Sequence, residues 1–73
     1  MTKVAVEAAE IYKELRNLVS EARKCGMEDS GSYRKLVNVL NELASALHAM
    51  LYIDKKLDPE VEEKVKEALN PPT

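Results

Sequence analysis

Residues 32–53 read SYRKLVNVLNELASALHAMLYI, a stretch without glycine or proline. Four of every seven positions in it are apolar, which is more than half of the circumference of an α-helix. A helix with so wide an apolar arc typically has neighbours on several sides. The sequence therefore predicts a central helix over residues 32–53. Its apolar positions form four heptad rows: Tyr33, Leu40 and Leu47; Leu36, Leu43 and Met50; Val37, Ala44 and Leu51; Val39, Ala46 and Ile53.

A second long helix is predicted upstream, over residues 3–25. Its apolar residues also recur every seven positions, as a globular bundle helix requires. Thr2 can cap its start, and Gly26 suits the left-handed position that follows a helix. The apolar rows of this helix are Val4, Ile11, Leu18 and Cys25; Ala8, Leu15 and Ala22; Ala5, Tyr12 and Val19.

A short third helix is predicted over residues 58–69. Asp58, Pro59 and Glu60 form a strong start signal, because they supply an N-cap, a proline at the first helical position and an acid near the positive helix end. Pro71 and Pro72 would stop this helix. The 73 residues thus predict one all-α domain, a small three-helix bundle in which residues 3–25 and 32–53 form a long antiparallel hairpin.

The three predicted helices differ in length in a way that bears on function. At ~1.5 Å per residue the first two span about 35 Å each and the third about 17 Å. We expect the third to cover the start of the first helix, around Val4 and Ile11, and the end of the second. The remaining apolar residues are the predicted interface: Leu15, Leu18, Val19, Ala22, Tyr33, Leu36, Val37, Leu40 and Leu43.

Leaving that interface in water would forfeit on the order of 1.5–3 kcal/mol per side chain, against a total stability of about 5–15 kcal/mol. We therefore expect a second polypeptide to cover it. A second copy is the simplest choice, since two-fold dimers are the commonest oligomers, and a larger helical bundle would result. A foreign amphipathic helix, or a monomer that closes on itself, are the alternatives.

Composition argues against several other classes of partner. With 11 basic and 13 acidic residues, a net charge of −2 gives no electrostatic reason to expect nucleic acid. No uninterrupted apolar run approaches the ~18 residues of a membrane span, and no secretory leader is seen. One lone thiol fits a reducing cytoplasm. We expect a cytoplasmic protein that acts on no membrane.

The chain also lacks a recognisable set of catalytic or metal-ligating residues. His48 is the only histidine and has no carboxylate one helical turn away, and Cys25 lies at a helix C-terminus that disfavours a thiolate. We expect no enzymatic activity, no metal and no cofactor. Basic residues near the 26–32 linker keep a nucleic-acid contact as an alternative, and small core residues keep a small ligand as another.

Residues 57–69 follow the rules used to design capped helices, so an engineered helical scaffold or binder is a further alternative. Against it stand Cys25, His48, Asn38 and Asn41, which are typical of evolved chains. The sequence therefore predicts a non-catalytic helical module that works by self-association or by binding another protein.

Overall fold

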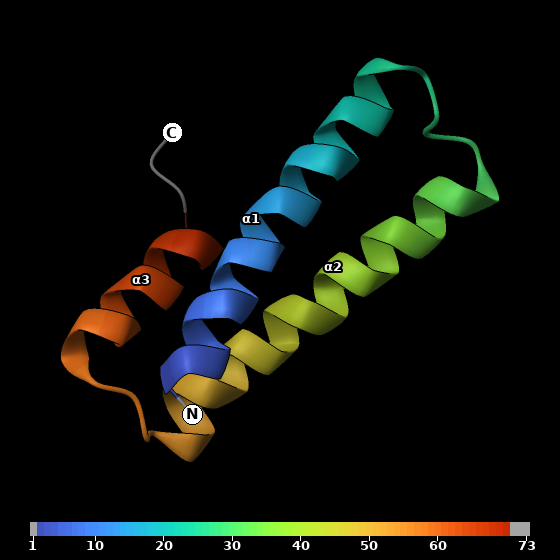
Figure 1. Ribbon diagram of the computed structural model, residues 1–73. Helices are drawn as coiled ribbons and strands as arrows, with labels where there is room; N and C mark the ends of the chain where they lie inside the picture. Colours follow the sequence, from blue (N-terminus) through green and yellow to red (C-terminus); the bar gives the residue numbers. More distant parts are fainter. Residues whose placement is uncertain (1, 71–73) are drawn as a thin grey trace.

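Three helices make up the computed structural model, which describes residues 2–70. Helix α1 spans Thr2–Lys24, α2 spans Gly31–Ala49, and α3 spans Pro59–Leu69. Helices α1 and α2 form an antiparallel hairpin, and α3 folds back beside the N-terminal half of α1 (Figure 1). The prediction of a small all-α three-helix bundle is confirmed. The predicted stop at Pro71 and Pro72 lies outside the described residues.

The turn between α1 and α2 is built from local hydrogen bonds. Gly26 has φ of 79°, a left-handed conformation that glycine adopts without steric cost. The next N–H, that of Met27, donates to the carbonyl of Ala22 at 3.0 Å, which closes the last turn of α1. Ser30 then caps α2, because its Oγ accepts a hydrogen bond from the Tyr33 N–H at 3.0 Å.

The second long helix changes its winding before it ends. A π-helical segment, η1, spans Met50–Asp54 and continues α2 without a gap. Lys55 then takes a left-handed conformation with φ of 51°, and its N–H donates to the carbonyl of Met50 at 3.3 Å. Lys55 is the residue that caps the helix, so the helix does not continue into Lys56. Leu57 is buried and fixes the start of the return to α3.

The core lies at the end of the hairpin where all three helices meet. Leu47 of α2 and Val65 of α3 are the largest side chains with no exposed surface. Around them α1 and α3 contribute small residues, chiefly Ala5, Ala9 and Ala68, which allow close approach of the two backbones. Arg16 of α1 donates a hydrogen bond to the carbonyl of Ala68, at the C-terminal end of α3.

Two expectations from the sequence are wrong. Helix α3 covers Ala5 and Ala9 of α1, whereas Val4 and Ile11, which we expected it to cover, are each 56% exposed. Adjacent residues point ~100° apart around a helix, so docking on the alanines leaves the bulkier row uncovered. Val19 and Ala22, expected to lie uncovered, are instead 5% and 7% exposed, in the half of α1 that packs beside α2 beyond the end of α3.

Candidate interaction face

An apolar row on α1 is exposed along almost the whole helix. Val4, Ile11 and Leu18 follow one another at intervals of seven residues and are 56%, 56% and 52% exposed. Seven residues make nearly two full turns, so the three side chains lie on one side of α1. That side is turned away from α3, whose contacts fall on the alanine row beside it.

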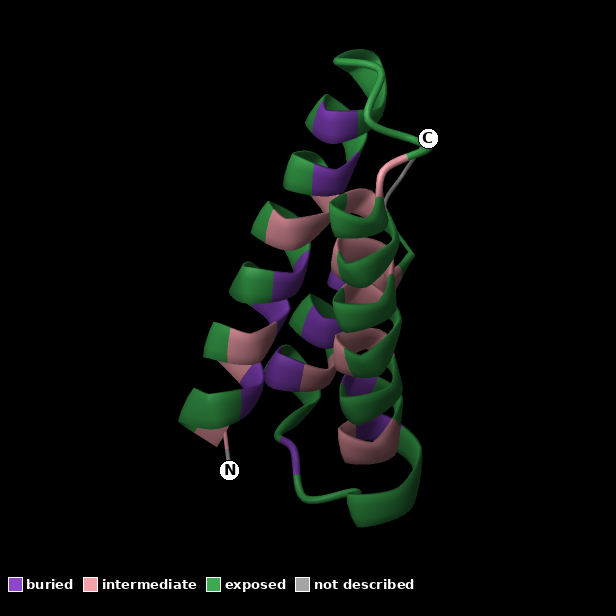
Figure 2. Ribbon diagram, turned by 90° about the vertical axis from the view of Figure 1, so that its right-hand side faces the viewer, coloured by how far each residue is buried: buried purple, intermediate pink, exposed green. Residues whose placement is uncertain are grey.

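A second apolar row follows α2. Val39 is 54% exposed, and the exposed Ala46 follows it by seven residues on the same side of the helix. Ile53 is 77% exposed, but it lies in the π-helical segment η1, which does not keep the seven-residue repeat. The two rows border the same shallow groove, since a hollow of the surface is lined by Ile11, Leu15, Leu18 and Val39 with Glu14 at its rim. We call the two rows and this groove the open face. It lies on the side of the hairpin turned away from α3. Figure 2 shows α2 in front of the other helices, with most of its outward side exposed.

The open face overlaps the predicted interface only in part. Leu18 and Leu15 belong to both, and Val19 and Ala22 are buried in the chain itself. Five predicted residues of α2 are half-buried: Tyr33, Leu36, Val37, Leu40 and Leu43. Four exposed residues were not predicted, although their heptad rows are visible in the sequence: Val4, Ile11, Val39 and Ile53.

Charged residues flank the open face on both helices. On α1, Glu7, Glu14 and Glu21 are exposed and seven residues apart, and each follows a residue of the apolar row by three positions. On α2 the flanking positions carry Lys35 and Glu42, both exposed. Three or four positions along a helix bring a side chain to nearly the same face, so these charges form the polar rim of the apolar rows.

At the end of the hairpin far from α3, one side-chain contact joins α1 to α2. The Nε and Nη2 atoms of Arg23 both donate to the hydroxyl of Tyr33, at 3.1 and 2.9 Å. This hydrogen bond, together with the nearby Tyr33 oxygen, raises the pKa of Arg23 further above its already high value. The guanidinium group of Arg23 is thus engaged within the hairpin.

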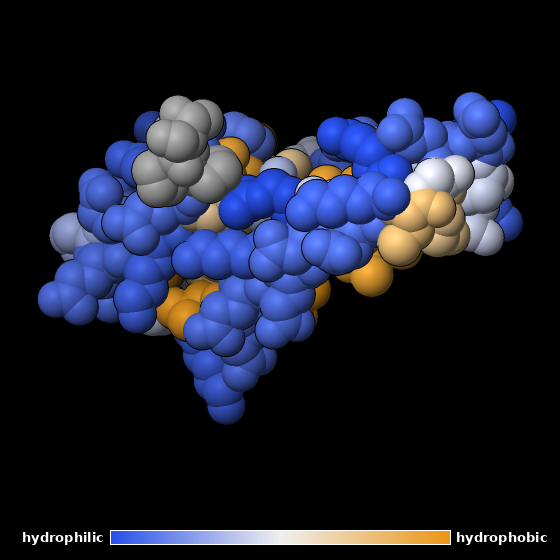
Figure 3. All heavy atoms as spheres, turned by 90° about the horizontal axis from the view of Figure 1, so that it is seen from above, coloured by the Kyte–Doolittle hydropathy of each residue, from blue (hydrophilic) through white to orange (hydrophobic). Residues whose placement is uncertain are grey.

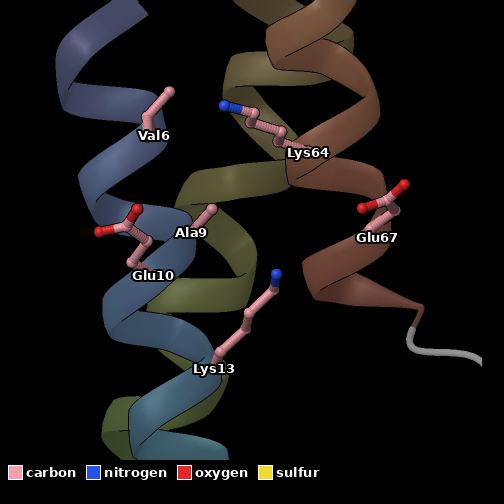
Figure 4. Close-up of a pocket in the computed structure, with 6 residues that line it drawn as sticks. All are labelled: Val6, Ala9, Glu10, Lys13, Lys64 and Glu67. Carbon is pink, nitrogen blue, oxygen red and sulfur yellow. The ribbon is translucent and has the colours of Figure 1, made fainter.

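A second hollow lies between α1 and α3, away from the open face. Val6 and Ala9 form its floor, and Glu10, Lys13, Lys64 and Glu67 surround it (Figure 4). All four charged residues are exposed, and the two lysines are balanced by two glutamates. A balanced rim in water provides neither an anion nor a cation with a strong site. Elsewhere the surface seen from above is mainly hydrophilic, with separate smaller apolar patches (Figure 3).

The residues singled out for possible chemistry lie apart. His48 is exposed, and its ring stacks on that of Tyr52 with 5.8 Å between the centroids. Cys25 is a free, exposed cysteine in the turn after α1. Within residues 2–70, no group of three histidine, cysteine, aspartate or glutamate side chains is placed to hold a metal ion.

The segment Gly31–Asp54 is long and apolar enough, by length and composition, to cross a membrane. Its 24 residues have a mean hydropathy of 1.3 in their most apolar window, and 11% of that window is buried in the structure. The core helix of a soluble protein can meet the same composition test. Such a core helix is mostly buried, whereas most of this window is left exposed or half-exposed by the rest of the chain.

Neither a protein-family model, nor a curated protein, nor a solved structure matches this chain.

Proposed function

We propose that this protein is a non-catalytic association module, which acts by packing its open face against the helices of another protein subunit. The observation that carries the proposal is the pair of exposed apolar rows on α1 and α2, on the side that α3 leaves uncovered. Single exposed apolar residues are ordinary on protein surfaces. Contiguous apolar patches with a polar rim are typical of binding sites.

The free energy available from this face is of the right size for association. Four side chains of the two rows, Val4, Ile11, Leu18 and Val39, are each more than half exposed. Burying the exposed half of such a side chain contributes ~0.8–1.5 kcal/mol, or about 3–6 kcal/mol for the set. Association costs roughly 4–15 kcal/mol in lost freedom of motion, so a partner must contribute apolar surface of its own.

The polar side of α2 favours a protein partner over a membrane. Asn38, Asn41, Glu42, Ser45 and His48 are all exposed. A membrane span would surround these groups with hydrocarbon, where buried polar groups without partners cost several kcal/mol each. Helices packed on the open face would cover the apolar rows and leave this polar side in water.

Site-specific photo-crosslinking tests the proposal. A photoreactive residue would replace Val39 on the open face and, as control, Lys64, which is exposed on α3. We expect irradiation of the full chain, pure or mixed with a cell extract, to give adducts of discrete mass from position 39 only. Equal, unspecific labelling at the two positions would refute the proposal.

A further inference from the structure

We propose that the subunit covering the open face is a second copy of this chain, related by a two-fold axis parallel to the helices. In this dimer, α1 of each protomer packs against α2 of the other, and four helices share one core. The inference rests on the proposed function and names its partner. It is supported by the dimensions of the face, by its pattern of large and small residues, and by its charges.

The dimensions of the molecule match those of a second hairpin. The protein measures 40 × 22 × 17 Å, and the open face runs along its long axis. Two packed helices, with axes ~8–10 Å apart and diameters of ~10–12 Å, present a face about 20 Å wide. Over the length of the hairpin, this footprint is of the order of the ~800 Å² that each partner contributes to a stable interface of standard size. A single helix would cover about half of this width. A two-helix surface covers both apolar rows at once.

Large and small side chains alternate between the two helices of the face, so that two copies of the face can interlock. Leu18 and Val39 line the same groove, so they lie at about the same level of the hairpin. Seven residues further on, Ile11 comes level with Ala46. A two-fold axis parallel to the helices keeps these levels, so Ile11 of each protomer lies over the partner's Ala46. Such a pairing of large with small side chains lets facing layers interdigitate.

The charges select this arrangement from the two that are possible. A two-fold axis across the helices would instead place α1 on the partner's α1, and the acidic row of Glu7, Glu14 and Glu21 would face its own copy. With the axis parallel to the helices, Glu21 lies beside the partner's Lys35. Opposite charges at an interface favour one orientation, and like charges oppose the other.

One repulsive contact remains in the favoured arrangement, and it provides the test. Glu14 lies within one residue, or ~1.5 Å, of the level of Glu42 across the hairpin, so in the dimer it is near the partner's Glu42. Glu42→Lys would turn two like-charge contacts per dimer into two attractive ones. We expect the dissociation constant to fall about tenfold, from the usual size of exposed ion pairs.

Sedimentation equilibrium over a wide concentration range measures this constant directly. We expect the mass to approach twice 8.2 kDa as concentration rises. Lys35→Glu should weaken the dimer by about the same factor. The matched control for Glu42→Lys is Glu63→Lys, which makes the identical change of charge at an exposed position of α3. It should leave the dissociation constant unchanged. A gain in affinity cannot result from a variant that fails to fold.

The possible outcomes separate this inference from the proposed function. A chain that stays monomeric at every concentration, also with Glu42→Lys, overturns the second copy as partner. Equal effects of Glu42→Lys and Glu63→Lys, or a weaker dimer with Glu42→Lys, overturn the arrangement. If crosslinking at Val39 then gives an adduct of another mass, the proposed function stands with a different partner. If it gives no specific adduct, both proposals fall.

Discussion

Replacing Leu47 by alanine tests the core that holds the three helices together. The Leu47 side chain has no exposed surface and belongs to the cluster that joins α1, α2 and α3. Leucine-to-alanine changes in cores cost about 2–5 kcal/mol, depending on how far the neighbours can fill the space. Several of these neighbours, Ala5, Ala9 and Ala68, are too short to do so. We therefore expect a loss of ~3–4 kcal/mol.

Urea denaturation followed by far-ultraviolet circular dichroism measures this loss. For a small protein the free energy of unfolding falls by ~1 kcal/mol per molar urea, so the midpoint of Leu47→Ala should move down by about 3 M. A domain of this size has a thin margin of stability, and the variant is expected to be partly unfolded without denaturant.

The matched control is Leu18→Ala, which removes the same atoms from a side chain that is 52% exposed. In dilute solution it should cost about 1 kcal/mol, since less than half of the leucine surface is buried. If the second copy covers Leu18, this cost will grow with protein concentration, whereas that of Leu47→Ala will not. Equal losses for the two variants at low concentration would show that Leu47 is not at the centre of the core.

Three further predictions concern the backbone and are measured by the same denaturation curves. Gly26→Ala should destabilise by about 1–2 kcal/mol because of its left-handed φ of 79°, whereas Gly31→Ala, in helical backbone with open space around it, should be neutral or stabilising by ~0.5 kcal/mol. A milder effect at Gly26 than at Gly31 would contradict the turn geometry. Ser30→Ala should cost about 1 kcal/mol through loss of the cap on α2, and the neighbouring Ser32→Ala less than 0.5 kcal/mol; similar losses would mean that Ser30 does not cap the helix. Lys55→Gly should stabilise by up to ~1 kcal/mol, since φ of 51° is costly for any residue with a Cβ. A loss of stability there would argue against the left-handed end of η1.

The crosslinking and sedimentation experiments are most informative when read together with these curves. A variant such as Lys35→Glu changes an exposed residue, so its free energy of unfolding in dilute solution should stay within ~0.5 kcal/mol of that of the original protein. A change in its dimer constant can then be assigned to the open face.

Much of the fold was predictable because its signals are local. Glycine, proline and capping residues act on the backbone within a few positions, and the predicted start of α3 at Asp58 and Pro59 is confirmed. The end of α2 was less clear. Its π-helical turn and the left-handed Lys55 have no simple sequence signature, because lysine rarely takes that conformation.

The amino-acid sequence by itself determined that there are three helices, where they lie in the chain, and which residues share a side of each α-helix. Those properties follow from backbone sterics and the 3.6-residue repeat, which involve only near neighbours in the chain. Only the tertiary structure decided which apolar side became core. The alanine row and the Val4–Ile11 row lie next to each other on α1, and both could have received α3. Close approach at Ala5 and Ala9, with Arg16 bound to the end of α3, places α3 on the alanines and leaves the larger side chains exposed.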